Sequence, residues 1–414
     1  MSAVPKSRRR TRSIAVIMTA LAMAVLTLGA PAATGGPAGQ AHAASSLPCD
    51  VYAAGGTPCA TAHSTTRALF ASYNGPLYQI QRASDRQLLD VGLLAAGGVV
   101  NAAPQTSFCS GTSCTITKIY DQTGNHNDMP ISWGGFWKGP GPNGADVGAD
   151  AMALPVTVAG HQAFGVKVTP GVGYRIDNAR GVPTGSQPAG IYMVTSSNLV
   201  NGLCCFDYGS GENSHTDTGN ATMNAIEWGT ACWFGGCVGS GPWVEADLEN
   251  GMYHTNTGSN KDPNNSGVHF PFVSAWEKNN GTSNFTLKYG NATSGGLTRP
   301  FSGPLPNGYS PMRVDSSILL GTGGDNSNGA VGEFFEGAVT FGYPSDATED
   351  AVQAGITAAG YGSGGGGGGF PTGNHQLVIG NDGLCLDVNG NSTASGAAII
   401  QWSCNGQTNQ QFQF

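Results

Sequence analysis

Three carboxylates occupy alternate positions in the segment 243–250, which reads Trp-Val-Glu-Ala-Asp-Leu-Glu-Asn. Alternate side chains of a β-strand share one face, so Glu245, Asp247 and Glu249 would lie beside Trp243, while the apolar residues between them face a core. Hydrolysis of a glycosidic bond uses such groups, because one carboxyl protonates the leaving oxygen, a second attacks or activates water, and an aromatic ring carries the sugar. A solvated strand face is the alternative interpretation.

A second acid for such a pair stands in the segment 321–329, Gly-Thr-Gly-Gly-Asp-Asn-Ser-Asn-Gly, directly after the apolar run 317–320. Glycines let the backbone approach a ligand closely, and Asp325 held there would be placed to donate a proton. The alternative is an Asx-turn, in which the Asp325 side chain accepts from its own backbone. The segment lacks the Gly-Lys-Ser/Thr ending of a phosphate-binding loop.

All ten cysteines follow residue 43, and an even number in an exported chain predicts disulfides. Cys204 and Cys205 are neighbours; a bond between them would present a rigid sulfur surface to a sugar, although neighbours lie closer than most bridged residues. The alternative is that each bridges elsewhere. Trp233, in one of the stapled loops, would stack on substrate or fill the core. The spacing predicts the remaining pairs Cys49 with Cys59, Cys109 with Cys114, Cys232 with Cys237, and Cys385 with Cys404.

The elements that must position these residues are short strands. The chain has 65 glycines and only 11% charged residues, and alternating runs such as 190–194 and 317–320 recur between turn residues. This pattern predicts an all-β sandwich or barrel. We expect one domain over 44–361, a flexible linker at 362–369, where Gly-Ser precedes six glycines, and a small module over 370–414.

Residues 1–43 have the features of a signal peptide: basic residues, an apolar run over 14–28, and the small-residue site Ala-His-Ala ending at position 43. They predict a secreted, extracellular protein, and no later stretch is long enough to span a membrane. The net charge of −8 argues against a nucleic-acid partner. The eight histidines show no metal-ligand spacing, so we expect neither a metal nor a cofactor.

Residues 49–361 resemble the catalytic domain of glycoside hydrolase family 54. The members of this family are secreted α-L-arabinofuranosidases. The resemblance is carried by the segments 62–69, 119–122, 204–209, 247–250 and 323–330. It implies a concanavalin-like β-sandwich and hydrolysis with retention of anomeric configuration.

By this resemblance Glu249, rather than Glu245, is the nucleophile, and Asp325 is the acid/base. Gly251 stands where family members often carry asparagine, and the 232–237 pair looks like an added staple. The family's sugar-contacting positions correspond to Asp247, Asn250, Trp233, Gly324, Cys204 and Cys205.

The tail resembles a single repeat of a ricin-type β-trefoil lectin. Because a full trefoil needs three repeats, and about 45 residues with one disulfide bury little core, we expect an incomplete module. The repeat's sugar-contacting positions correspond to Asp387, Trp402, Asn405, Asn409 and Gln410.

Together these features predict a monomeric, exo-acting retaining α-L-arabinofuranosidase that removes terminal arabinofuranosyl residues from arabinoxylan or arabinan. A retaining mechanism requires the two carboxyls about 5 to 5.5 Å apart. Two alternatives stay open: another exo-glycosidase specificity, such as β-xylosidase or galactofuranosidase, and a non-catalytic carbohydrate-binding protein.

Overall fold

The computed structural model describes residues 47–363, 374–377 and 384–413. The expected signal peptide and most of the expected linker lie outside these residues. The positions Gly362 and Ser363, which we assigned to the linker, belong to a strand, β21 (Tyr361–Ser363).

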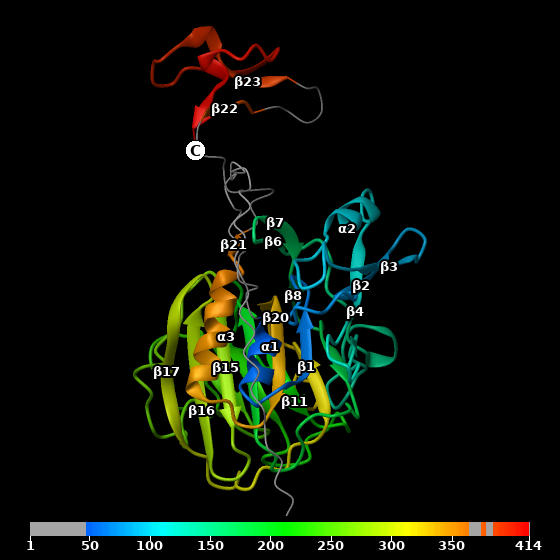
Figure 1. The fold of residues 1–414 in the computed structure, drawn as a ribbon, viewed down its shortest axis with the longest axis vertical. Helices are drawn as coiled ribbons and strands as arrows, with labels where there is room; N and C mark the ends of the chain where they lie inside the picture. The colour runs from blue at the N-terminus through cyan, green and yellow to red at the C-terminus, as the bar shows by residue number, and fades with distance from the viewer. Residues whose placement is uncertain (1–46, 364–373, 378–383, 414) are drawn as a thin grey trace, which may run out of the picture. The chain divides into compact units, whose positions relative to one another are not determined.

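Two six-stranded antiparallel sheets pack face to face as a β-sandwich (Figure 1). The first sheet has the order β1 (Cys59–Ser64), β20 (Glu336–Phe341), β10 (Ala189–Thr195), β15 (Val273–Asn279), β16 (Asn284–Asn291) and β17 (Ser294–Pro304). The second has the order β14 (Met252–Tyr253), β13 (Trp243–Asp247), β12 (Asn224–Gly229), β11 (Asp207–Gly211), β18 (Ser317–Leu320) and β9 (Tyr174–Ile176). The predicted all-β class is confirmed.

Strand alternation decides which side chains of the second sheet fill the core. Trp228 lies opposite Val244, and both are fully buried. Asn224, on the same face of β12, donates to Glu277 of β15 at 3.1 Å, so this face meets the first sheet. Burial of each large apolar side chain contributes about 1.5 to 3 kcal/mol. The opposite face of the second sheet is left to carry the acids.

Helices cover the outer face of the first sheet (Figure 1). The helix α3 (Asp346–Ala358) begins at Ser345, whose hydroxyl accepts from the Thr348 amide at 3.1 Å. Its Glu349 forms a buried ion pair with Lys278 of β15 at 2.8 Å.

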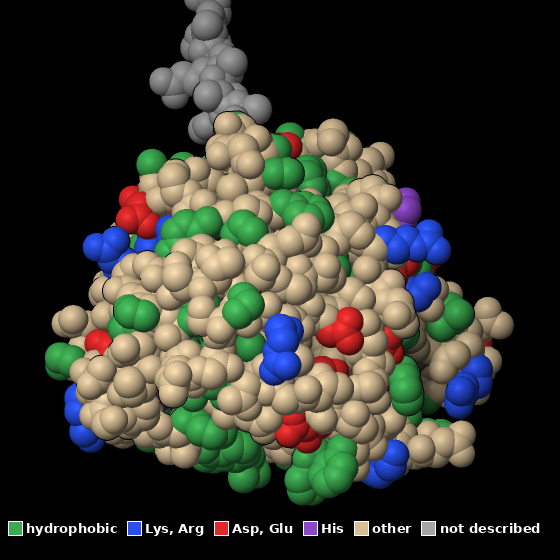
Figure 2. Space-filling view, turned by 90° about the horizontal axis from the view of Figure 1, so that it is seen from below, with side chains coloured by type: hydrophobic (Ala, Val, Ile, Leu, Met, Phe, Trp, Pro, Cys, Tyr) green, Lys and Arg blue, Asp and Glu red, His purple; other side chains and the backbone are tan. Residues whose placement is uncertain are grey.

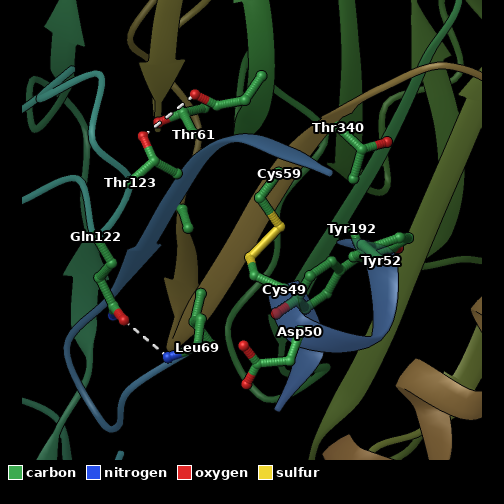
Figure 3. Close-up of a disulfide and its surroundings, with 12 residues drawn as sticks. Cys49, Asp50, Tyr52, Cys59, Thr61, Leu69, Gln122, Thr123, Tyr192 and Thr340 are labelled. Atoms are coloured by element: carbon green, nitrogen blue, oxygen red, sulfur yellow. Dashed lines mark hydrogen bonds between the residues drawn. A yellow bond between two sulfur atoms is a disulfide. The ribbon is translucent and has the colours of Figure 1, made fainter. Parts of the chain in front are cut away.

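The helix α1 (Pro48–Ala54) is fastened to β1 by the Cys49–Cys59 disulfide (Figure 3). Tyr52 of α1 packs on Tyr192 of β10, with ring centroids 6.1 Å apart. The disulfide thereby fixes the start of the domain to the edge of the sandwich.

Smaller elements complete the fold. Charged side chains are sparse on the face shown in Figure 2. Within the described ranges, none of the helices has the length and apolar character needed to cross a membrane.

Within residues 47–363, three smaller sheets and two further short helices accompany the sandwich. The first sheet has the order β3 (Leu88–Val91), β2 (Tyr78–Arg82), β4 (Cys114–Ile119) and β5 (Met129–Pro130). The second has the order β21, β6 (Pro155–Val158) and β7 (His161–Phe164), and the third pairs β19 (Gly332–Phe334) with β8 (Val166–Val168). The short helices are α2 (Ala103–Phe108) and η1 (Pro142–Gly144).

The described residues of the tail form two small antiparallel pairs and two single turns. β22 (Asn374–His375) pairs with β25 (Phe412–Gln413), and β23 (Cys385–Val388) pairs with β24 (Ile399–Trp402). The turns are η2 (Asn389–Asn391) and η3 (Thr408–Gln410). All five predicted disulfides, including the bond between the neighbours Cys204 and Cys205, are formed.

Candidate active site

A pocket opens where β13 ends. It brings together all the catalytic and sugar-contacting positions that the family resemblance implied for this domain, from four separate segments of the chain. Its lining is Cys204, Cys205, Trp233, Phe234, Asp247, Glu249, Asn250, Gly251, Met252, Gly323, Gly324, Asp325 and Ser327.

Glu249 lies in a turn rather than in the strand that we predicted for 243–250, because β13 ends at Asp247. Glu249 and Asn250 have φ angles of 61° and 54°, a left-handed conformation that is uncommon for residues other than glycine. The Asp247 carboxylate holds the turn by accepting from the Glu249 amide at 3.1 Å, and Tyr309 donates to the Asn250 carbonyl at 2.6 Å.

Two residues of β13 that we expected beside Glu249 lie outside the pocket. Glu245 and Trp243 are both buried and do not line the pocket, so the interpretation as a solvated face is wrong. Trp243 meets His254 edge-on, with ring centroids 5.4 Å apart, and does not form the aromatic platform. The exposed aromatic rings of the pocket are Trp233 and Phe234.

A row of buried carboxyls crosses three strands behind the pocket. Asp207 of β11 lies opposite Glu227 of β12, which lies opposite Glu245 of β13. Burial, with the charge of Glu245 adding to it, raises the pKa of Glu227 to about 8. Burial, then the charge of Glu227, likewise raises the pKa of Asp247 to about 8. The floor of the pocket therefore holds carboxyls that tend to keep their protons.

Glu212 was not predicted from the sequence, yet it lies against the nucleophile candidate. Its side chain is fully buried; Oε1 accepts from Thr222 at 2.6 Å, while Oε2 has no partner among the described residues. Side-chain oxygens of Glu212, Asp217 and Glu249 lie within 4.8 Å of one another. Burial first, and then the charges of Glu212 and Asp247, raise the pKa of Glu249 well above the usual carboxyl range. The only local feature of the sequence that could have indicated Glu212 is its position directly after the strand β11.

The backbone at Gly324 passes directly over these two acids. A Cβ on Gly324 would collide with Glu212 Oε2 and would lie 2.8 Å from Glu249 Oε2. At Gly323 a Cβ would lie 2.9 Å from the sulfur of Cys205. Both positions therefore need glycine, because any side chain would displace the walls of the pocket.

Asp325 lies in the turn that we considered as an alternative to a catalytic role, and it also lines the pocket. Its Oδ1 accepts from the amide and the hydroxyl of Ser327 at 2.9 and 2.5 Å. Because both bonds go to Oδ1, the other carboxylate oxygen remains available to a ligand.

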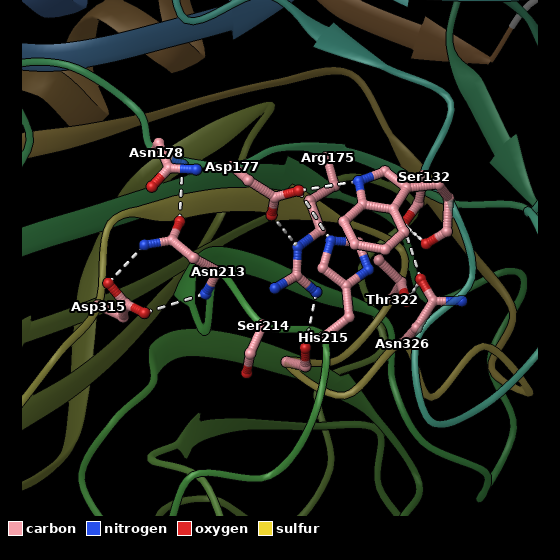
Figure 4. A network of polar contacts seen from close by, with 12 residues as sticks. Ser132, Arg175, Asp177, Asn178, Asn213, Ser214, His215, Asp315, Thr322 and Asn326 are labelled. Carbon is pink, nitrogen blue, oxygen red and sulfur yellow. Dashed lines mark hydrogen bonds and ion pairs between the residues drawn. The ribbon is translucent and has the colours of Figure 1, made fainter.

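Arg175 holds the loop that carries Asp325, and Figure 4 shows Arg175 with its neighbours Asp177 and His215. Its guanidinium donates to the Gly324 carbonyl at 2.7 Å and pairs with Asp177 at 2.9 Å. Asp177 also accepts from His215 at 2.8 Å. Asn326, fully buried, accepts from Ser132 at 2.7 Å. These contacts fix the acid loop before any ligand arrives.

The tail carries a second pocket. Four of its five predicted sugar-contacting residues, Asp387, Trp402, Asn405 and Asn409, line this pocket. Gln410 does not: its side chain is fully buried and donates to Asp387 Oδ2 at 2.8 Å. Gln410 therefore orients Asp387 instead of facing the pocket.

The fold and the pocket that contains Glu249 define a β-sandwich protein whose acid-lined pocket has one aromatic wall and one wall formed by a disulfide. The family model described as "Alpha-L-arabinofuranosidase B, catalytic" matches residues 48–362, and the chain belongs to this family. Residues 368–414 match the model described as "Ricin-type beta-trefoil lectin domain-like".

Similar proteins agree with this assignment. The probable α-L-arabinofuranosidase B of Aspergillus fumigatus is 50% identical over 339 residues, which are 81% of this chain and 65% of that protein. The "Arabinofuranosidase/B-xylosidase" of Trichoderma koningii is 48% identical over 318 residues, 76% of this chain and 63% of that protein. The chain thus spans slightly less than two thirds of the length of these relatives.

Solved structures are similar as well. A crystal structure of an arabinofuranosidase complexed with arabinofuranosyl-α-1,2-xylobiose has a TM-score of 0.76 and 40% identity, covering 87% of this chain and 75% of that chain. A family 54 α-L-arabinofuranosidase soaked with a cyclic sulfate inhibitor has a TM-score of 0.76 and 38% identity, covering 89% and 78%.

Proposed function

We propose that this protein is a secreted, exo-acting, retaining α-L-arabinofuranosidase. The observation that carries the proposal is that Glu249 and Asp325, 76 positions apart in the chain, line the same pocket together with Trp233 and the Cys204–Cys205 disulfide. The names of the similar proteins support the sugar specificity.

In the first step the Glu249 carboxylate attacks the anomeric carbon, the glycosidic C–O bond breaks, and the carboxyl proton of Asp325 passes to the leaving oxygen. In the second step the Asp325 carboxylate takes a proton from water, and this water displaces Glu249 from the sugar. The transition states are oxocarbenium-like. Their positive charge relieves the repulsion that Glu249 experiences from Glu212 and Asp247, which favours its ionised form when it reacts.

The remaining lining residues have binding roles in this proposal. Asp247 and Asn250 accept or donate hydrogen bonds to the sugar hydroxyls, Gly324 lets the ring approach closely, and Trp233 and the disulfide pack on its carbon atoms. Arabinoxylan or arabinan is the proposed polymer. The tail pocket around Asp387 and Trp402 would bind a second sugar unit.

Secretion is proposed from residues 1–43 and from the five disulfides, which form in oxidising compartments. The proposed organisation is a catalytic domain that begins at 44 and ends with β21 at 363, a linker over 364–369 and a sugar-binding module over 370–414.

The test is hydrolysis of p-nitrophenyl α-L-arabinofuranoside by residues 44–414 and by Glu249→Gln. We expect activity in the first and nearly complete loss in the variant. Glu277→Gln is the matched control, because Glu277 is also buried but lies between the sheets. No turnover by the folded, oxidised protein would contradict the proposal.

A second variant and the product configuration test the remaining roles. Asp325→Asn should lose about 100-fold or more on an arabino-oligosaccharide and less on the p-nitrophenyl glycoside, whose leaving group needs little protonation. Equal losses on both would argue against its acid role. Nuclear magnetic resonance of the first product should show the anomeric configuration of the substrate, and inversion would contradict the double displacement.

A β-xylosidase activity is a second candidate, because the Trichoderma koningii relative has both activities in its name. A panel of p-nitrophenyl α-L-arabinofuranoside, β-D-xyloside and β-D-galactofuranoside would rank the three specificities directly.

A further inference from the structure

A short loop beside Asp325 carries three exposed aromatic side chains, which lie outside the pocket that contains Glu249. Trp133, Phe136 and Trp137 are 55%, 67% and 54% exposed, in a chain in which only 8% of residues are aromatic. None of them lines the pocket that contains Glu249. The energetic cost of exposing such apolar surface indicates a binding role.

The loop is joined to the backbone of Asp325. The Trp137 amide donates to the Asp325 carbonyl at 3.3 Å, and Asn326 donates to the Trp137 carbonyl at 3.4 Å. A Cβ on Gly135 would lie 2.7 Å from the Asp325 carbonyl and would collide with the carbonyl of His215. Gly135 therefore allows the aromatic loop and the acid loop to lie in direct backbone contact.

The aromatic side chains are held in place before any ligand binds. Trp133 stacks on His215 with ring centroids 3.8 Å apart, and its indole N–H donates to Asp177 at 2.9 Å. Phe136 and Trp137 meet edge to face at 5.6 Å. Rigid aromatic groups lose little entropy on binding, so such a surface is preorganised.

The proposed role of Asp325 indicates which part of the substrate lies next to this loop. Asp325 protonates the oxygen that leaves, so the part of the substrate attached to that oxygen must lie on the Asp325 side, outside the pocket. For a side chain of a polysaccharide, this part is the main chain. One face of a pyranose ring is made of C–H groups and packs well on an aromatic ring.

We propose that Phe136 and Trp137 form a platform that binds the main-chain sugar bearing the arabinofuranosyl group. The occupant is a pyranose unit of a neutral polysaccharide main chain. This inference rests on the proposed function, because it takes Asp325 to be the acid. It deepens that function by assigning the side of the protein on which the polymer is held.

The test compares a substrate that has a main chain with one that lacks it. We would measure kcat/KM on soluble arabinoxylan and on p-nitrophenyl α-L-arabinofuranoside for the wild type, Trp137→Ala, Trp137→Phe and Phe136→Ala. We expect the ratio of the two values to fall roughly tenfold in each alanine variant, the size of one aromatic contact. Trp137→Phe should recover most of the ratio.

Two controls distinguish this platform from other exposed apolar side chains of the protein. Leu88→Ala removes a 51% exposed side chain of β3 and should leave the ratio unchanged. Trp402→Ala removes a 58% exposed tryptophan from the tail. If Trp402→Ala lowers the ratio while Trp137→Ala does not, the tail holds the polymer and the inference is wrong.

Two further outcomes would overturn the inference while leaving the proposed function intact. These are an unchanged ratio in Trp137→Ala, and equal losses on both substrates, which would mean that the loop serves only to position Asp325. A wild type inactive on both substrates would instead overturn the proposed function itself.

Discussion

Replacing Glu212 by Gln tests whether this buried acid sets the ionisation of the nucleophile candidate. Side-chain oxygens of Glu212 and Glu249 lie within 4.8 Å of each other, and both residues are buried. Two unit charges at that distance interact by about 3.5 kcal/mol at an effective dielectric constant of about 20, which corresponds to about 2.5 pK units. Water in the open pocket screens part of this, so we expect a shift of about 1 to 2 units.

The sign follows from the charge that is removed. Burial raises the pKa of Glu249, and the negative charge of Glu212 raises it further. Neutral glutamine removes the second effect, so Glu249 loses its proton at a lower pH. Because attack requires ionised Glu249, the acidic limb of the kcat/KM profile should move to lower pH. The assay is the pH profile on p-nitrophenyl α-L-arabinofuranoside.

Glu277→Gln is again the matched control, and its acidic limb should coincide with that of the wild type. A limb in Glu212→Gln that stays in place, or that moves to higher pH, would refute the electrostatic reasoning. A uniform loss of activity without a shift would give Glu212 a purely structural role.

Three other perturbations follow from contacts in the structure. Gly324→Ala should lower kcat/KM at least tenfold in assays on the p-nitrophenyl substrate, because the new methyl collides with Glu212, whereas Gly296→Ala, which meets nothing within 4 Å, should not. Burial raises the pKa of Glu227 to about 8 in the folded state, so thermal unfolding should show stability falling between about pH 4.5 and 8, and Glu227→Gln should remove part of this fall, while the part due to Asp247 stays. The double variant Cys204→Ala with Cys205→Ala should raise KM more than it lowers kcat, because it removes a wall of the pocket; unchanged steady-state kinetics would exclude a binding role for the disulfide.

Local patterns were sufficient for several features. Short separations between cysteines predicted the disulfides, since nearby residues meet at little entropic cost. Alternation along β13 correctly predicted that Val244, Ala246 and Leu248 face the core. The glycine-rich segment after β18 was predicted to let the backbone approach a ligand, and in the structure Gly324 leaves no room for a Cβ beside Glu212 and Glu249.

The same alternation was misleading at the end of β13. It placed Glu249 with Glu245 on one face, whereas the left-handed turn at Glu249 and Asn250 directs Glu249 into the pocket. The strand period cannot reveal where a strand stops, because the stop depends on the neighbouring strand: β14 is only two residues long, and pairs with Ala246 and Asp247.

The sequence by itself determined the class of fold, the disulfide pairs and the candidate acids, because each depends on periodicity, spacing or residue type. Only the tertiary structure decided that Glu212 lies against Glu249 and that the Trp133–Trp137 loop lies against Asp325. The Trp137 and Asn326 that join these two loops are 189 positions apart. Such contacts arise when the sheets close and bring strand ends together, and no local propensity encodes them.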